Sequence, residues 1–348
     1  YQTSIDAQHQ RSHRQDGYTL PEPARLLSHR FRAAGYYTAN IKEITPDLKV
    51  AGKTDLNFRT TRPFDGHAWS ELASKQPFFA QINFLEPHRG DAWVEARKQS
   101  HLVDPGKVTL PPVYPDHPIM RDVWANYLDA INLLDRKVGV VLELLEKQGL
   151  AKNTIVVFFG DNGRPMFRGK GTLYDGGLAV PLLVRWPGKI KPGTVRPDLI
   201  SLIDLAPTML GAAGIEPADL PGQDFLAAKS QPRRAVFAAR DRLDEVEDTI
   251  RAVRTNRFKY IRNFQPGRSA LEDSAHTRRA FPEFELFREL NRRRLLSPAQ
   301  QSVVRIRDDE ELYDLESDPW ELRNLASDPK HQLMKEMLRH SLMEWITA

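Results

Sequence analysis

Two polar stretches follow apolar runs, and their residue types could bind a metal ion and an anion. The run TIVVFF leads into Asp161 and Asn162, and the run FFAQINF leads into Glu86, His88 and Arg89. Carboxylate and carboxamide oxygens are hard donors that suit Ca²⁺ or Mg²⁺ better than a soft metal. Asp, Asn and Gly are also common turn residues, so DNG taken alone is equally compatible with a plain turn.

A cation follows the first of these stretches within the glycine-rich segment FRGKGTLYDGG. Lys170 has a glycine on either side, which lets the backbone approach a ligand while the ammonium group neutralises an anion. A histidine with an ordinary pKa is a suitable proton donor near neutral pH, and His88 is the first candidate. The residues therefore predict an oxyanion-binding site with an oxygen-ligated metal.

The elements that position these groups alternate between strands and helices over about two thirds of the chain. A helix is expected from near Pro23 to Gly35, and an amphipathic helix from Arg121 to Gly149. Strands are expected at residues 77–86, 153–161 and 180–187, followed by a helix at 202–215. This alternation predicts an α/β fold with a largely parallel sheet covered on both faces, in which TIVVFF is a central strand and functional groups lie at strand carboxyl ends.

The alternation changes after residue 228. Short strands then follow one another without long helices between them, and an amphipathic helix closes the chain. The sequence therefore predicts a catalytic domain at residues 1–228 and a smaller α+β subdomain at 229–348.

Composition excludes several other functions. The 348 residues contain no cysteine, which rules out disulfides, thiolate metal sites and a cysteine nucleophile among them. No apolar run is long enough to span a membrane. Lys and Arg outnumber Asp and Glu by 50 to 46, but the charges are mixed and the densest basic stretch lacks interleaved aromatic residues, which argues against nucleic acid binding.

Several segments in order resemble the type I, formylglycine-dependent sulfatases of the alkaline phosphatase superfamily. They are EPHRG, DNGRPMFRGKGTLYDGGLAVPLLVRWPGKI, SLIDLAPTMLGAAGI, RAVRTNRFKYIRNF and ELYDLESDPWELRNLA. The Pro-His-Arg order is most similar to heparan N-sulfatase (sulfamidase)-like members. The resemblance implies an alkaline phosphatase-like sandwich with a C-terminal subdomain, and hydrolysis of a sulfate ester or sulfamate on a glycosaminoglycan-type sugar. A phosphonate monoester or phosphodiester hydrolase, or a non-catalytic glycan- or anion-binding protein, remains an alternative.

The resemblance also implies residue roles. Asp161 and Asn162 match calcium ligands, with Mg²⁺ as a possible replacement, and Lys170 matches a cation that contacts sulfate. His88 matches a histidine that contacts the sulfate ester and helps protonate the leaving group. Lys53 matches the lysine of a glycine-lysine-x-histidine motif.

One position departs from the family pattern, because Asp55 stands where that motif has histidine. His9 and His13 are the reserve proton donors, and Arg89 and Arg168 are expected to contact an anionic sugar together with Arg11 and Arg14.

The family nucleophile is a formylglycine made from Cys or Ser in a C/S-x-P-x-R motif, and this motif does not occur in the 348 residues. We expect it upstream of Tyr1, together with a first strand and two further calcium carboxylates. The chain alone is then expected to be inactive. The intact protein would need a formylglycine-generating or anaerobic sulfatase-maturing enzyme, and the resemblance places it in the periplasm or outside the cell.

Overall fold

The chain forms two compact units that interleave along the sequence, as a computed structural model shows. The first unit takes residues 1–85, 138–154 and 200–233, and the second takes 86–137, 155–199 and 234–348. The domain division predicted near residue 228 remains a prediction, because these units are defined by packing and each uses several segments. The structure describes residues 19–20, 24–54, 58–98, 102–217, 220–243, 245–271 and 274–348.

The first unit is built around strand β1 (Tyr37–Thr45). It pairs in parallel with β3 (Gly66–Ala68) and β4 (Phe78–Ile82), and antiparallel with the short β2 (Leu48–Lys49). Four successive residues of β1, 38–41, are buried, as expected for a strand covered on both faces. This parallel pairing agrees with the expected α/β organisation, although β4 ends at Ile82, earlier than predicted.

Short helices cover this sheet. Helix α1 (Leu27–Ala33) precedes Gly35, whose φ of 87° suits the turn into β1, and Phe31 of α1 stacks on Phe79 of β4 at 4.5 Å. Asp65 joins α1 to β1, because it accepts hydrogen bonds from Arg32 Nε and Thr38 N, both at 2.9 Å. The other helical elements of this unit are η2 (Trp69–Glu71), η4 (Ala151–Asn153), η5 (Leu202–Asp204) and α5 (Leu205–Ala212).

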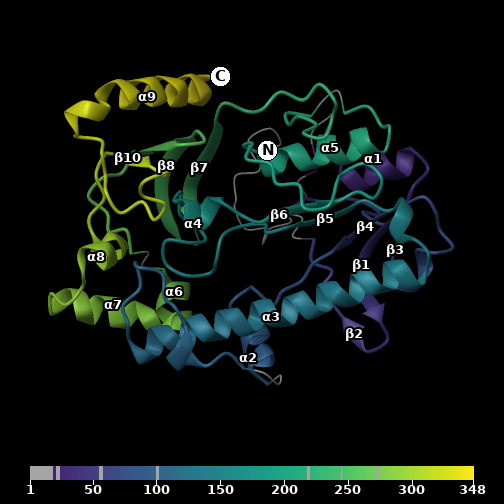
Figure 1. Cartoon of the computed structure of the whole chain (residues 1–348), viewed down its shortest axis with the longest axis horizontal. Coiled ribbons are helices and arrows are strands. Elements are labelled where there is room, and N and C mark those ends of the chain that lie inside the picture. The colour runs from purple at the N-terminus through teal and green to yellow at the C-terminus, as the bar shows by residue number, and fades with distance from the viewer. Residues whose placement is uncertain are drawn as a thin grey trace. The chain divides into compact units, whose positions relative to one another are not determined.

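Helix α3 (Pro118–Lys147) is the long amphipathic helix predicted from the sequence, and its observed limits confirm that prediction (Figure 1). Its first twenty residues belong to the second unit and its last ten to the first. Although α3 is long, no helix in the described part of the chain is both long and apolar enough to cross a membrane.

The second unit contains a two-stranded sheet, β5 (Val156–Phe159) with β6 (Leu182–Arg185). The two strands run antiparallel, whereas the alternation of elements predicted parallel neighbours. The connection between them carries only the four-residue helix α4 (Asp175–Leu178), so it lacks the crossover helix that parallel strands need. Phe159 is 45% exposed. The expectation of a doubly covered central strand was therefore wrong for β5 and applies to β1.

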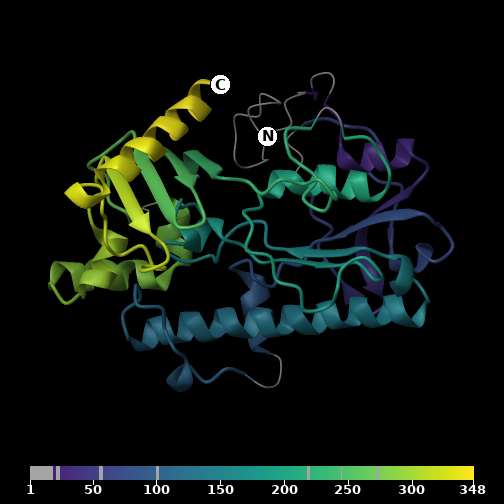
Figure 2. The same ribbon diagram turned by 45° about the horizontal axis from the view of Figure 1, so that its top comes forward.

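A four-stranded antiparallel sheet forms the C-terminal part of the second unit. Its order is β10-β9-β8-β7, with β7 at Val236–Leu243, β8 at Val246–Arg254, β9 at Phe258–Asn263 and β10 at Glu310–Asp314. The closing helix α9 (Gln332–Thr347) packs Leu338 and Leu342 against Val253 and Tyr260 on one face of this sheet (Figure 2). The strands and the closing helix agree with the elements expected after residue 228.

Aromatic and aliphatic side chains from α2 (Asp91–Arg97), α3 and α7 (Pro282–Arg292) form a large core in the second unit. Phe167 lies within this core and makes ring contacts with Phe281, Phe284 and Phe287. The segment that follows the DNG sequence is thereby anchored by its own apolar residue. The remaining helices of this unit are η3 (Pro105–Lys107), α6 (Ala275–Ala280), α8 (Pro298–Val304) and η6 (Pro329–His331).

Candidate active site

The segment of residues 163–177 is a tightly closed loop in which glycines are required by the packing of backbone against backbone. A Cβ atom on Gly163 would lie 2.0 Å from the Gly176 carbonyl oxygen, and one on Gly169 would lie 2.1 Å from that of Arg164. A Cβ on Gly177 would lie 2.4 Å from the Thr172 carbonyl oxygen. Gly163 N donates to Gly177 O at 3.1 Å and joins the two ends. This loop therefore holds a fixed shape between the DNG sequence and α4.

Asp161 and Asn162 stand where this loop begins, just after β5. Asp161 is exposed, and its carboxylate forms no hydrogen bond or ion pair with any residue that the structure describes. The Nδ2 of Asn162 donates to Gly163 O at 2.9 Å, which leaves Oδ1 as the acceptor available to a cation. Two neighbouring hard oxygen donors without internal partners fit a Ca²⁺ or Mg²⁺ ligand pair.

Two ligands are too few for Ca²⁺, which takes about six to eight oxygens. Within the described ranges, no three His, Asp or Glu side chains gather into a metal-binding group. The residues present therefore fit part of a calcium site.

Lys170 lies within the closed loop that begins just after Asp161 and Asn162. Its backbone nitrogen donates to Arg164 O at 2.8 Å, and Gly171 after it has a φ of 85°. The side chain is partly exposed. The predicted sulfate-contacting cation thus lies in the closed loop that directly follows the predicted metal ligands.

A pocket of about 610 Å³, which we call the Asn162 pocket, opens beside the start of this loop. Its size is in the usual range for a small-ligand site. Its wall includes one carboxamide, two guanidinium groups, two carboxylates and four aromatic rings: Asn162, Arg164, Arg168, Asp175, Glu321, Trp124, Tyr127, Tyr174 and Trp320.

Besides the buried Arg168, the part of the Asn162 pocket wall that the structure describes contains one cation, Arg164. Its Nε donates to the Tyr114 hydroxyl at 2.9 Å, and its guanidinium carbon lies 5.9 Å from the centre of the Trp320 ring. The Tyr114 hydroxyl in turn donates to Phe167 O at 2.8 Å. Arg164 is held in place without a carboxylate partner among the described residues, so its charge remains available to an anion.

A buried charge cluster fixes the far end of the loop. Lys259 is fully buried, and its Nζ lies 2.5 Å from Asp175 Oδ1 and 2.7 Å from Glu321 Oε1. Glu321 Oε2 also accepts from Asp175 N at 2.7 Å, and Arg254 Nη2 donates to Asp175 at 3.1 Å. Burial alone would raise the pKa of Asp175, but Lys259 and Arg254 lower it. Burial raises the pKa of Glu321 even though Lys259 opposes the shift.

The segment with His88 is held by ion pairs on both sides. Glu86 is buried against Lys137, and Arg89 donates two hydrogen bonds to Glu283, at 2.6 and 2.8 Å. His88 lies between them and is exposed. It is therefore presented on the surface of the second unit by anchored neighbours.

Arg89 and Arg168 are expected to contact substrate, and both form bonds inside the protein. The guanidinium of Arg89 pairs with the buried Glu283 and lies 4.0 Å from the centre of the Phe281 ring. Arg168 is 5% exposed, lies 3.7 Å above the Tyr174 ring and donates to Glu321 O at 2.9 Å and Trp320 O at 3.1 Å. Both groups are bonded inside the protein, and Arg168 also lines the Asn162 pocket, so substrate contact remains a prediction for each of them.

The remaining predicted residues lie in the first unit or outside the described residues. Lys53 is exposed in the first unit, and its predicted sulfate contact remains a prediction. His9, His13 and Asp55 lie outside the described residues, as do Arg11 and Arg14.

Sequence reasoning missed Arg164 and Trp320. Arg164 directly follows the DNG sequence, and this position was the available signal. Trp320 lies far along the chain, so only the fold brings it to the Asn162 pocket.

The family profiles and known proteins that this chain matches are those of sulfatases. The family profile described as Sulfatase matches residues 66–215, and the profile described as N-sulphoglucosamine sulphohydrolase, C-terminal, matches residues 163–273. An ulvan-active sulfatase of Formosa agariphila is 34% identical over 400 residues, which cover 100% of this chain and 65% of that protein. The human N-sulphoglucosamine sulphohydrolase is 28% identical over 310 residues, covering 78% of this chain and 60% of that protein.

A solved structure described as a 2-O GAG sulfatase has a similar backbone. Its TM-score is 0.67 at 20% sequence identity, over 99% of this chain and 79% of the other. The chain thus spans about two thirds or less of the length of the curated relatives that it matches.

Proposed function

The chain belongs to the sulfatase family of the alkaline phosphatase superfamily, and on that premise we propose that the full-length protein hydrolyses a sulfate ester or a sulfamate on a carbohydrate. The similarity of its backbone to a sulfatase confirms the alkaline phosphatase-like α/β sandwich predicted from the sequence. The observation that carries the proposal is the closed loop of residues 163–177, which joins Asp161 and Asn162 to Lys170.

The proposed substrate is a sulfated polysaccharide unit of the glycosaminoglycan type. The relatives named above include an ulvan-active sulfatase and an N-sulphoglucosamine sulphohydrolase. Trp124, Tyr127 and Trp320 in the Asn162 pocket offer flat apolar surfaces to the C–H faces of a sugar ring, and Arg164 offers a cation to its anionic groups.

Asp161 and Asn162 would hold Ca²⁺, with Mg²⁺ as the alternative, together with further ligands. When bound, the metal withdraws charge from the sulfate oxygens. Lys170 adds a fixed positive charge, so the repulsion between the sulfate and an attacking nucleophile falls. His88, which is exposed and held by its neighbours, would donate a proton to the leaving oxygen or nitrogen.

The proposal includes two partners of the full-length protein besides its substrate. The nucleophile of the family is a formylglycine, so a formylglycine-generating or anaerobic sulfatase-maturing enzyme would act on the protein. We also propose that it works in the periplasm or outside the cell, where polysaccharide substrates are met.

The experiment that tests the proposed function separates metal binding from charge neutralisation. In the full-length protein, Asp161→Ala should remove bound Ca²⁺, measured by mass spectrometry of the metal, and abolish cleavage of an aryl sulfate. Asp135→Ala removes an exposed carboxylate of α3 and should change neither. Unchanged metal content in Asp161→Ala would overturn the metal assignment.

Lys170→Ala gives the second measurement. It should keep the metal but lower kcat by about a hundredfold or more, because a preorganised charge in a partly dehydrated site stabilises the transition state strongly. A decrease below about threefold would contradict the role assigned to Lys170.

A further inference from the structure

A second pocket of about 560 Å³ lies on the face of the C-terminal sheet in the second unit, and we call it the arginine pocket. It is lined by the loop after Lys170, the β7–β8 hairpin, β9 and the segments on either side of α6 to α8. Its polar lining residues include Arg240, Asp248, Asn263, Arg268, Arg307 and Glu311. The proposed mechanism uses none of them.

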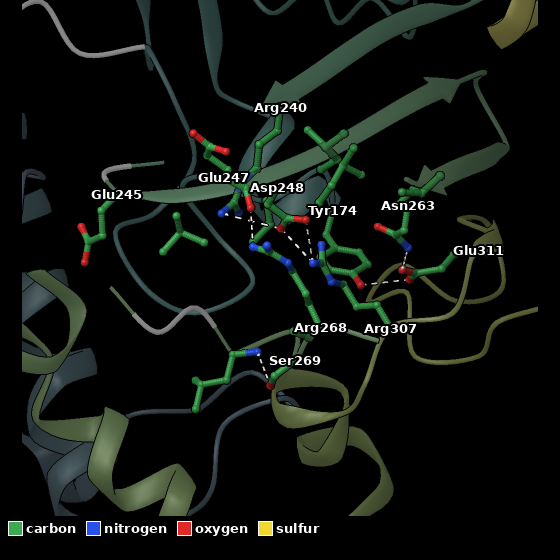
Figure 3. A pocket seen from close by; sticks show the side chains of 17 residues that line it. Tyr174, Arg240, Glu245, Glu247, Asp248, Asn263, Arg268, Ser269, Arg307 and Glu311 are labelled. Carbon is green, nitrogen blue, oxygen red and sulfur yellow. Dashed lines mark hydrogen bonds and ion pairs between the residues drawn. The ribbon is translucent and has the colours of Figure 1, made fainter. Parts of the chain in front are cut away.

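Guanidinium groups from three separate segments converge in this pocket. Figure 3 shows Arg240, Arg268 and Arg307 directed toward the centre, where Asp248 lies, whereas Glu245 points away. Arg307 Nη2 lies 2.8 Å from each carboxylate oxygen of Asp248, and Arg240 Nη2 lies 3.8 Å from Oδ2. One carboxylate thus faces three cations.

Three further carboxylates line the pocket, those of Glu245, Glu247 and Glu311, and the last two pair with cations outside it. Glu247 pairs with Arg242, and Glu311 pairs with Arg305 at 3.1 Å while accepting from Tyr174 and Asn263. Neither Arg242 nor Arg305 lines the pocket.

Arg268 is the cation that remains available. It is exposed, and its Nη1 donates to the backbone oxygen of Glu247. It forms no ion pair with any carboxylate in the described ranges. A guanidinium group held at one nitrogen presents its other donors to an anion, and its planar fork matches a carboxylate or a sulfate.

The chain limits how far this pocket lies from Lys170. Thr172, two residues later, lines the arginine pocket, so its Cα lies within about 7 Å of the Lys170 Cα. Tyr174 lines both the arginine pocket and the Asn162 pocket. A polymer held at Lys170 could therefore place a neighbouring unit in the arginine pocket.

We propose that the arginine pocket binds the anionic group of a sugar unit next to the one that is desulfated, with Arg268 as the contacting cation. The anion is a uronate carboxylate or a second sulfate. The role of this pocket in substrate binding rests on the proposed function, whereas its affinity for an anionic sugar does not.

The test measures binding of three small probes to the chain by calorimetry at low ionic strength. The probes are methyl glucuronide, the 6-sulfate of methyl glucoside, and neutral methyl glucoside. At least one anionic probe should bind more tightly than the neutral one, and Arg268→Ala should weaken it about tenfold, the usual effect of losing a charge-assisted hydrogen bond. Selective loss of glucuronide binding identifies a carboxylate subsite, and selective loss of the sulfated probe identifies a second sulfate subsite.

Two control variants test whether the probes bind in the arginine pocket. Arg262→Ala removes a neighbouring cation of β9 that does not line the pocket, because successive side chains of a strand point to opposite faces, and it should leave binding unchanged. Lys170→Ala should also keep glucuronide binding. Equal affinity for all three probes, or an Arg268→Ala effect below twofold, overturns the proposal. Failure of the full-length protein to cleave any sulfate would overturn the proposed function and leave these binding results valid.

Discussion

Removal of the Lys259 ammonium group should open the loop of residues 163–177, because the buried carboxylate of Glu321 and the partly buried carboxylate of Asp175 depend on it. Lys259 is fully buried, and its Nζ lies 2.5 Å from Asp175 and 2.7 Å from Glu321. Asp175 keeps Arg254 as a partner at 3.1 Å in the variant Lys259→Met. Glu321, which is 2% exposed, keeps only neutral donors. Breaking a buried ion pair in this way typically costs about 3–5 kcal/mol.

Hydrogen–deuterium exchange at peptides covering residues 163–178 measures this cost locally. A loss of 3 kcal/mol or more corresponds to exchange that is at least about a hundredfold faster. Restoring neutrality with Glu321→Gln in the Lys259→Met background should recover much of the protection. The same Glu321→Gln change in the wild-type background should cost protection, because it removes one partner of an intact pair.

The effect of Lys259→Met on hydrogen exchange should depend on pH in a defined direction. Burial raises the pKa of Glu321 against the opposing effect of Lys259, so loss of Lys259 should raise it further. Protonation then relieves the stranded charge, and the difference between Lys259→Met and wild type should shrink as the pH is lowered from 8 to 5. A difference below about tenfold that does not vary with pH would refute this account of the cluster.

Three further predictions concern the leaving group, the loop and the first unit. In the full-length protein, His88→Ala should slow cleavage of sugar sulfates far more than of an activated aryl sulfate, and equal losses would show that His88 does not supply the proton. Gly169→Ala should lower the free energy of unfolding by about 2 kcal/mol or more, since the new Cβ would lie 2.1 Å from a carbonyl oxygen. The control Gly139→Ala in α3 places its Cβ in open space and should raise the free energy of unfolding by about 0.5–1 kcal/mol. Burial would raise the pKa of Asp65, but hydrogen bonds from Thr38 and the charge of Arg32 lower it. The Asp65 carboxylate therefore stabilises the fold above pH 3.8, and this contribution is lost below it. The free energy of unfolding of Asp65→Asn, measured in urea, should therefore vary less with pH between 6 and 3 than that of the wild type. It should also vary less than that of the exposed-site control Asp47→Asn.

The features that the sequence predicted are those set by residues close to one another in the chain. The apolar spacing of α3 and the sequence DNG after a β-branched run identified an amphipathic helix and the candidate metal ligands without any knowledge of the fold. The antiparallel pairing of β5 with β6 was not predicted, because the 22-residue connection between these strands looks long enough for a crossover helix. Its glycines instead fold it into a closed loop.

Long-range partners could not be predicted. Arg89 looked available for substrate, but its partner Glu283 lies 194 residues further along the chain. Arg168 was expected at the substrate, yet its guanidinium reaches carbonyl groups about 150 residues away. No spacing rule links such positions, so a lone cation in a sequence cannot be assigned to a ligand or to an internal ion pair before the tertiary contacts are known.

The interleaved segments of the two units have a consequence for folding during synthesis. The first unit cannot be completed until residue 233 has left the ribosome, and the second needs residues from 86 to the end of the chain. Residues 86–137 and 155–199 of the second unit are made before the first unit can be completed, and they must wait for residues 234–348 before their own unit can fold. A chain that stalls or terminates before residue 233 would expose apolar segments of both units, and we expect such products to depend on chaperones or to be degraded.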